Sequence, residues 1–130
     1  MSQAEADWIL KAMIVMAAAD ARLDAREVGA IRKIYQEQTG REIDALAVVL
    51  AVQTYATRRA LIEDLSVAAR VMRDETKETI FRAAFLTAEA NGQFSPQERE
   101  RLAAIAAALG LSDSDMQEIA AGSEKGDGLD

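Results

Sequence analysis

Three acidic residues near the start of the chain are its strongest candidates for binding chemistry. Asp20, Asp24 and Glu27 follow one another within a short stretch. Carboxylate oxygens are the ligands that hard cations such as Ca²⁺, Mg²⁺ and Mn²⁺ prefer. The same spacing also suits helix capping, because Asp24 can cap a helix whose third residue is Glu27. Two interpretations therefore stay open, a cation site and a helix cap, and the positive end of a helix dipole favours the cap.

The residue types that the chain lacks exclude several other kinds of site. It contains no cysteine and no histidine, so disulfides, thiolate metal sites and imidazole bases are ruled out. Any metal site must then be built from oxygen ligands. The sequence also has no phosphate-binding loop and no glycine-rich fingerprint after a strand. We therefore predict a protein that is not an enzyme, with Ca²⁺, Mg²⁺ or Mn²⁺ as the candidate bound ions.

The charge balance limits the partners. The formal net charge is −7 and the isoelectric point is about 4.7. An acidic surface repels phosphate groups, so we expect no nucleic-acid binding. A protein partner is the expectation, with a divalent cation as a second candidate.

The apolar stretch from Trp8 to Ala19 is too short to span a bilayer, and no signal-peptide pattern is visible. We therefore expect no membrane insertion and a cytoplasmic location.

The pattern around the three carboxylates occurs twice in the chain. The first copy covers residues 19–27 and the second covers residues 90–98. A constant offset pairs Asp20 with Asn91, Glu27 with Glu98 and Ile34 with Ile105. In the second copy Ser95 takes the capping position. Each copy joins an apolar helix to a capped second helix, so we predict two pseudo-repeated helical hairpins, with residues 14–36 superposing on residues 85–107.

Hydrophobic periodicity and capping signals predict an all-α fold of about seven helices in one bundle. The Ser2–Glu5 box starts the first helix near Gln3, which ends near Ala19 or Asp20. The next helices are expected after Asp24 up to Gly40, at 42–54 and at 58–73. Asp74 or Thr76 is expected to cap the following helix. The last two are expected from Pro96 to Gly110 and from about Ser112 to Ala120. We predict one domain over residues 1–121 and a polar flexible tail over 122–130.

The apolar faces of these helices predict which side chains form the core. We expect ten to be largely buried: Trp8, Met13, Met16, Ile31, Ile34, Leu65, Phe81, Phe85, Leu102 and Ile105. Trp8 has an alternative role as an exposed anchor for a partner. Glu89 either joins an acidic patch with Asp20 or is a solvated charge near a helix end.

An apolar helix that ends in Ala-Ala-Asp, followed by a turn and a helix-start glutamate, resembles the TerB-like family, which is named for tellurite-resistance operons. Two groups of residues carry the resemblance: Ala18-Ala19-Asp20 with Asp24 and Glu27, and Ala90-Asn91-Gly92 with Ser95 and Glu98. The resemblance covers most of the chain and extends to the N-terminal module of some membrane-anchored J-domain co-chaperones. This sequence departs from the family pattern at Ala21, where a turn glycine is expected, and at Asn91, where an aspartate is expected.

The resemblance implies an all-helical bundle with acidic residues on one face, divalent-cation binding and a role in stress-related protein complexes. It implies no enzymatic reaction. We therefore expect a non-enzymatic binding module that responds to a divalent cation and is linked to tellurite or stress response. A metal-independent protein-interaction scaffold is the alternative. A bundle that holds a small molecule or lipid in an internal cavity is the third hypothesis.

Overall fold

Seven α-helices and one short 3₁₀ helix form the part of the chain that the computed structural model describes, which is residues 1–17, 24–55, 60–90 and 95–128. Side chains are described up to residue 122. The elements are α1 (Gln3–Ala17), α2 (Ala25–Thr39), α3 (Ala45–Tyr55), α4 (Leu61–Ala68), η2 (Ala69–Val71), α5 (Asp74–Ala90), α6 (Pro96–Leu109) and α7 (Asp113–Gly128). The predicted all-α bundle is confirmed. Among the described helices, none is long and apolar enough to cross a membrane.

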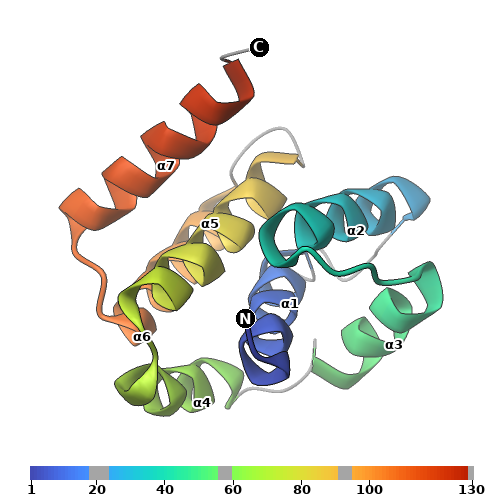
Figure 1. Ribbon diagram of the computed structural model, residues 1–130, viewed down its shortest axis with the longest axis horizontal. Coiled ribbons are helices and arrows are strands. Elements are labelled where there is room, and N and C mark those ends of the chain that lie inside the picture. Colours follow the sequence, from blue (N-terminus) through green and yellow to red (C-terminus); the bar gives the residue numbers. More distant parts are fainter. Residues whose placement is uncertain (18–23, 56–59, 91–94, 129–130) are drawn as a thin grey trace.

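Helix α1 lies at the centre of the bundle and packs along α5 (Figure 1). Helices α2 and α3 contact it on one side, α6 contacts it on another, and α7 packs against α5. The sequence of α1 is apolar on most of its circumference, so the helix is buried when neighbours pack on several sides of it. Its buried side chains include Ile9, Met13 and Met16. Small residues on α5, such as Ala84 and Ala88, are also fully buried.

The two predicted hairpins have matching helix starts and ends. Asp24 Oδ1 accepts a hydrogen bond from the Glu27 amide at 2.8 Å, and Ser95 Oγ accepts one from the Glu98 amide at 3.1 Å. Helices α2 and α6 then end at Gly40 and Gly110, whose φ angles are 72° and 73°. Only glycine adopts this left-handed conformation at little cost. The predicted caps and stops are therefore confirmed, while the superposition of the two hairpins stays a prediction.

Most of the predicted core is buried. Eight of the ten residues named from the sequence are buried: Met13, Met16, Ile31, Ile34, Leu65, Phe81, Phe85 and Ile105. Trp8 and Leu102 are partly buried instead. Trp8 lines a surface groove, and Leu102 lies one turn before the α6 residues that enter the core, Ile105 and Ala106.

Helix boundaries differ from the prediction at α3, α4, α5 and α7. Helix α3 starts later than expected, because Asp44 Oδ1 accepts the Ala47 amide and acts as the cap. Helix α4 is shorter and passes into η2. The expectation that Asp74 or Thr76 caps α5 is wrong: the first turn closes on the Arg73 carbonyl, and Thr76 is buried inside the helix. Helix α7 continues to Gly128, beyond the predicted end near Ala120.

Candidate functional site

The first predicted site lies at the start of α2. Asp24 is exposed and caps the helix, and Glu27 is half-buried three residues later. The third member, Asp20, lies outside the described residues. Within the described part of the chain, no group of three His, Cys, Asp or Glu side chains is close enough to hold a metal ion. The cation site over Asp20, Asp24 and Glu27 therefore stays a prediction, and the capping role of Asp24 is confirmed.

The corresponding residues at the start of α6 differ in burial. Glu98 is 3% exposed, and its Oε1 accepts the Ser95 amide at 3.0 Å, which completes a reciprocal capping box. Its second oxygen, Oε2, has no hydrogen-bond partner. One turn further on, Arg101 donates from Nη1 to the Val15 carbonyl at 2.9 Å, so a basic side chain satisfies one carbonyl in the last turn of α1. Tertiary contacts thus bury the second capping glutamate.

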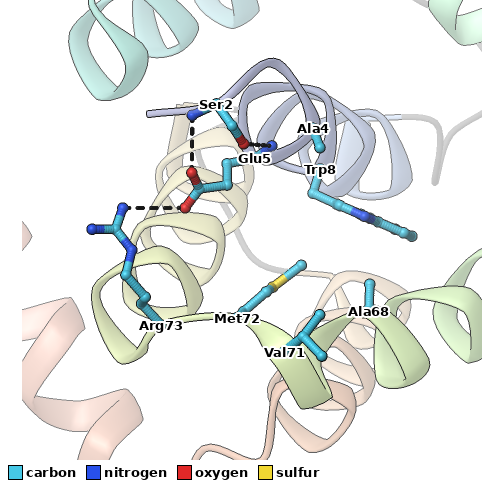
Figure 2. Close-up of a pocket in the computed structure, with 8 residues that line it drawn as sticks. All are labelled: Ser2, Ala4, Glu5, Trp8, Ala68, Val71, Met72 and Arg73. Carbon is cyan, nitrogen blue, oxygen red and sulfur yellow. Dashed lines mark hydrogen bonds and ion pairs between the residues drawn. The ribbon is translucent and has the colours of Figure 1, made fainter.

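A shallow groove lies between the first turn of α1 and the η2 segment (Figure 2). Its volume is about 420 Å³. Eight residues line it: Ser2, Ala4, Glu5, Trp8, Ala68, Val71, Met72 and Arg73. Figure 2 shows Trp8, Met72, Val71 and Ala68 around the apolar end, with Glu5 and Arg73 facing each other at the polar end. We refer to this feature as the α1–η2 groove.

Glu5 organises the polar end of the groove. Its carboxylate accepts hydrogen bonds from the buried Thr76 hydroxyl, from the Ser2 amide at 2.9 Å and from Arg73 Nη2 at 3.4 Å. These hydrogen bonds, the one from Thr76 above all, lower the pKa of Glu5 to about 2. Glu5 therefore stays ionised at neutral pH and links α1 to the first turn of α5. Arg73 remains largely exposed, with 68% of its side-chain surface accessible.

Trp8 lines the groove on the α1 side. The Lys11 ammonium lies 4.5 Å from the centroid of the Trp8 ring and 5.2 Å from that of Tyr55. Both are cation–π distances, so the lysine joins the end of α3 to α1. Trp8 is thus held by neighbours while one part of it faces the groove. Trp8 therefore packs against its neighbours, and its role as an anchor for a partner stays a prediction.

Two exposed valines lie in α4 and η2, the segment that forms one side of the groove. Val67 on α4 is 60% exposed and Val71 in η2 is 90% exposed. Among the described residues, every other large apolar side chain that is exposed belongs to α3 or to the first residue: Leu46, Val49, Leu50 and Met1. All except Met1 lie in the segment between the two hairpins. Exposed apolar side chains that lie next to one another are a common feature of surfaces that bind partners.

Two other hollows are less suited to a ligand. The hollow between α2 and α5, of about 300 Å³, brings Glu89 beside Lys33 and Glu37. Glu89 thus faces α2, whereas its predicted patch with Asp20 lies partly outside the described residues. A void beneath Trp8, between α1, α4 and α6, has about 10 Å³ of free space. That is about the room of one water molecule, so this void cannot hold a metabolite or lipid.

The α1–η2 groove was not predicted from the sequence. The Ser2–Glu5 capping box was recognised, but the contact of Glu5 with Thr76 and Arg73 joins residues far apart in the chain. The one available signal was Val71, an apolar residue beside charged Arg70 and Arg73. Such a residue is hard to distinguish from a core position without knowing where α4 ends.

Comparison with known proteins identifies a family. A search of curated proteins and a search of solved structures each returned no match. A family model described as tellurite resistance protein TerB matches residues 8–121. The match includes both hairpins and the segment between them, and it agrees with the resemblance noted from the helix-turn pattern. The chain therefore belongs to the TerB family.

Proposed function

We propose that this TerB domain is a non-enzymatic module that binds a protein partner through the α1–η2 groove and the exposed valines beside it. The observation that carries the proposal is an apolar groove of about 420 Å³ next to Val67 and Val71. A side chain of the partner could occupy the groove, and the partner would cover the two valines, which are poorly solvated by water. Membership of the TerB family supports a role in tellurite or stress response.

Site-specific photo-crosslinking tests this proposal. A photoreactive amino acid replaces Val71 in the full chain, and irradiation is carried out in cells that express the protein. We expect a covalent protein adduct from this position. The matched control carries the same photoreactive residue at Gln117, an exposed position on α7. The proposal fails if position 71 gives no more adduct than position 117.

The cation response is a second proposal, and it concerns the turn before α2. The donor set suits a hard cation, because Asp20, Asp24 and Glu27 supply charged oxygens. Asp24 Oδ1 already accepts the Glu27 amide, so one carboxylate would serve both as the cap and as a ligand. Isothermal titration calorimetry with Ca²⁺, Mg²⁺ and Mn²⁺ tests this proposal directly. Without saturable heat for any of the three ions, the metal-independent scaffold is the better description.

A further inference from the structure

The outer face of α4 and η2 carries charge of opposite sign at its two ends. Glu63, Val67 and Arg70 are spaced four and three residues apart, so they lie on one side of the helix. All three are exposed. Glu63 stands in the first turn of α4 and Arg70 in η2. The face is thus acidic where it begins, apolar in the middle and basic where it ends, with Val71 at its edge beside the groove. We call it the α4 face.

We propose that the α4 face binds a second copy of the same chain, with the two α4 helices antiparallel about a two-fold axis near Val67. This inference rests on the proposed function and names the partner of that surface. In this arrangement the two Val67 side chains meet at the axis. Glu63 of each copy then lies opposite Arg70 of the other, so one two-fold contact forms two ion pairs. A parallel arrangement would bring like charges together and is disfavoured.

The charge order of the face favours a second copy over an unrelated partner. A foreign protein would need its own basic, apolar and acidic groups in matching order, whereas a two-fold copy supplies them automatically. Each chain carries a net charge of −7, but repulsion between distant charges is screened beyond about 8 Å at physiological salt. Near the axis, the negative charge of Glu63 on one copy is offset by the positive charge of Arg70 on the other.

The exposed apolar stripe on α3 provides a contrast. Leu46, Val49 and Leu50 are exposed there, but α3 has no charged residue from Ala45 to Tyr55. That stripe therefore contains nothing that would orient a second copy. The α4 face has both apolar contact and paired charges of opposite sign, and charge patterns of this kind set orientation more than affinity.

The size of the face sets the expected affinity. Helix α4 and η2 together are about 18 Å long, and a stable interface buries about 800 Å² on each partner. The contact is therefore small, although the partner helix would also cover the Val71 wall of the groove. We expect dissociation constants in the micromolar range or weaker.

Sedimentation equilibrium of the purified chain, from about 10 µM to about 1 mM, measures this association. We expect a reversible monomer–dimer equilibrium. Glu63→Arg and Arg70→Glu should each weaken it by at least about tenfold, because each change places like charges at both ion pairs. The double variant Glu63→Arg/Arg70→Glu should restore the dimer to within about threefold of the unmodified chain, since both pairs then re-form with reversed sign.

Matched controls separate local pairing from net charge. Glu118→Arg and Arg99→Glu make the same charge changes at exposed positions on α7 and α6, and they should leave the dimer nearly unchanged. Circular dichroism checks that every variant is folded. The neutral variants Glu63→Gln and Arg70→Gln, which create no repulsion, should weaken the dimer less than the charge reversals.

Three results would overturn the inference: a monomer at every concentration, controls that weaken the dimer as much as the α4 variants, or a folded double variant that does not recover. Crosslinking at Val71 distinguishes these failures from failure of the proposed function. An adduct of twice 14.1 kDa supports a second copy. A specific adduct of another mass, with a monomeric chain, overturns the second copy and leaves the binding module standing.

Discussion

At the scale of single residues, Glu5 shows how one carboxylate can join two helices. It completes the capping box of α1 and also accepts hydrogen bonds from Thr76 and Arg73 at the start of α5. The pKa of Glu5 is lowered to about 2 from an ordinary value of 4.5. A carboxylate with a lowered folded-state pKa stabilises the fold above its unfolded pKa, and this contribution is lost as the pH falls toward the folded value.

This linkage predicts the pH dependence of a Glu5→Gln variant. Above about pH 5 the variant should melt at a lower temperature than the unmodified chain, because the charged hydrogen bonds are absent. The difference should shrink as the pH falls from 4.5 toward 2. Thermal melts followed by circular dichroism across this range measure it. A difference in melting temperature that does not change with pH would show that Glu5 acts through its shape and not through its charge.

Substitutions of Asp20 and Glu98 should have opposite effects on cation binding and stability. Asp20→Asn should abolish cation binding and leave the melting temperature nearly unchanged, because hard-cation affinity depends on the number of charged oxygens. Glu98→Ala should lower stability by about 1 kcal/mol through the lost capping contact and leave cation binding unchanged. Calorimetry and denaturant unfolding measure the two effects. Cation binding that survives Asp20→Asn but fails in Glu98→Ala would move the site to the second turn.

At the scale of elements, glycines in the left-handed conformation explain why α2 and α6 end where they do. Gly110 has a φ of +73° at the end of α6, and a Cβ added there would meet no atom within 4 Å. The cost of Gly110→Ala is therefore a backbone cost, and we expect a loss of about 1 kcal/mol in the free energy of unfolding.

Gly29 is the matched control for Gly110. It lies inside α2, where an added Cβ also meets nothing within 4 Å. Gly29→Ala should stabilise the protein by about 0.5–1 kcal/mol, because alanine has the better helix propensity. Glycine-to-alanine substitution should therefore raise the free energy of unfolding at Gly29 and lower it at Gly110, and urea unfolding measures both changes. Equal effects at both would contradict the assignment of Gly110 as a left-handed cap.

At the scale of the whole molecule, α1 and α5 pack against each other at the centre of the bundle. Phe85 is 8% exposed on α5, so Phe85→Ala should cost about 3–5 kcal/mol through lost burial and a cavity. Leu50→Ala on the exposed side of α3 is the control, and we expect a change within about 0.5 kcal/mol. A loss below about 1 kcal/mol for Phe85→Ala would contradict the packing of α5.

The internal repeat makes a prediction about the complete backbone. In an experimentally determined structure, residues 14–36 should superpose on residues 85–107 with Asp24 aligned to Ser95. The matching caps support this alignment. A shift of one helical turn between the two hairpins would show that the repeated pattern reflects capping chemistry alone.

The sequence by itself determined the helical elements and the family. Helix starts at Ser2, Asp24 and Ser95, and the stops at Gly40 and Gly110, depend on contacts within one turn of the chain. Such local chemistry can be read from neighbouring residues. The α3–α4 boundaries were less accurate because Asp44 was not recognised as a cap and no glycine or proline separates the two helices.

The tertiary structure alone decided where the α1–η2 groove lies. The α1–η2 groove joins Ser2 and Trp8 to Val71 and Arg73, which are far apart in the sequence. Thr76 was expected at a helix cap, and it instead donates to Glu5 because α5 packs beside α1. The sequence shows that Glu98 can cap a helix, but only the packing of the helices shows that its side chain is buried. Local patterns fix where helices begin and end, whereas exposure and grooves depend on which helices become neighbours.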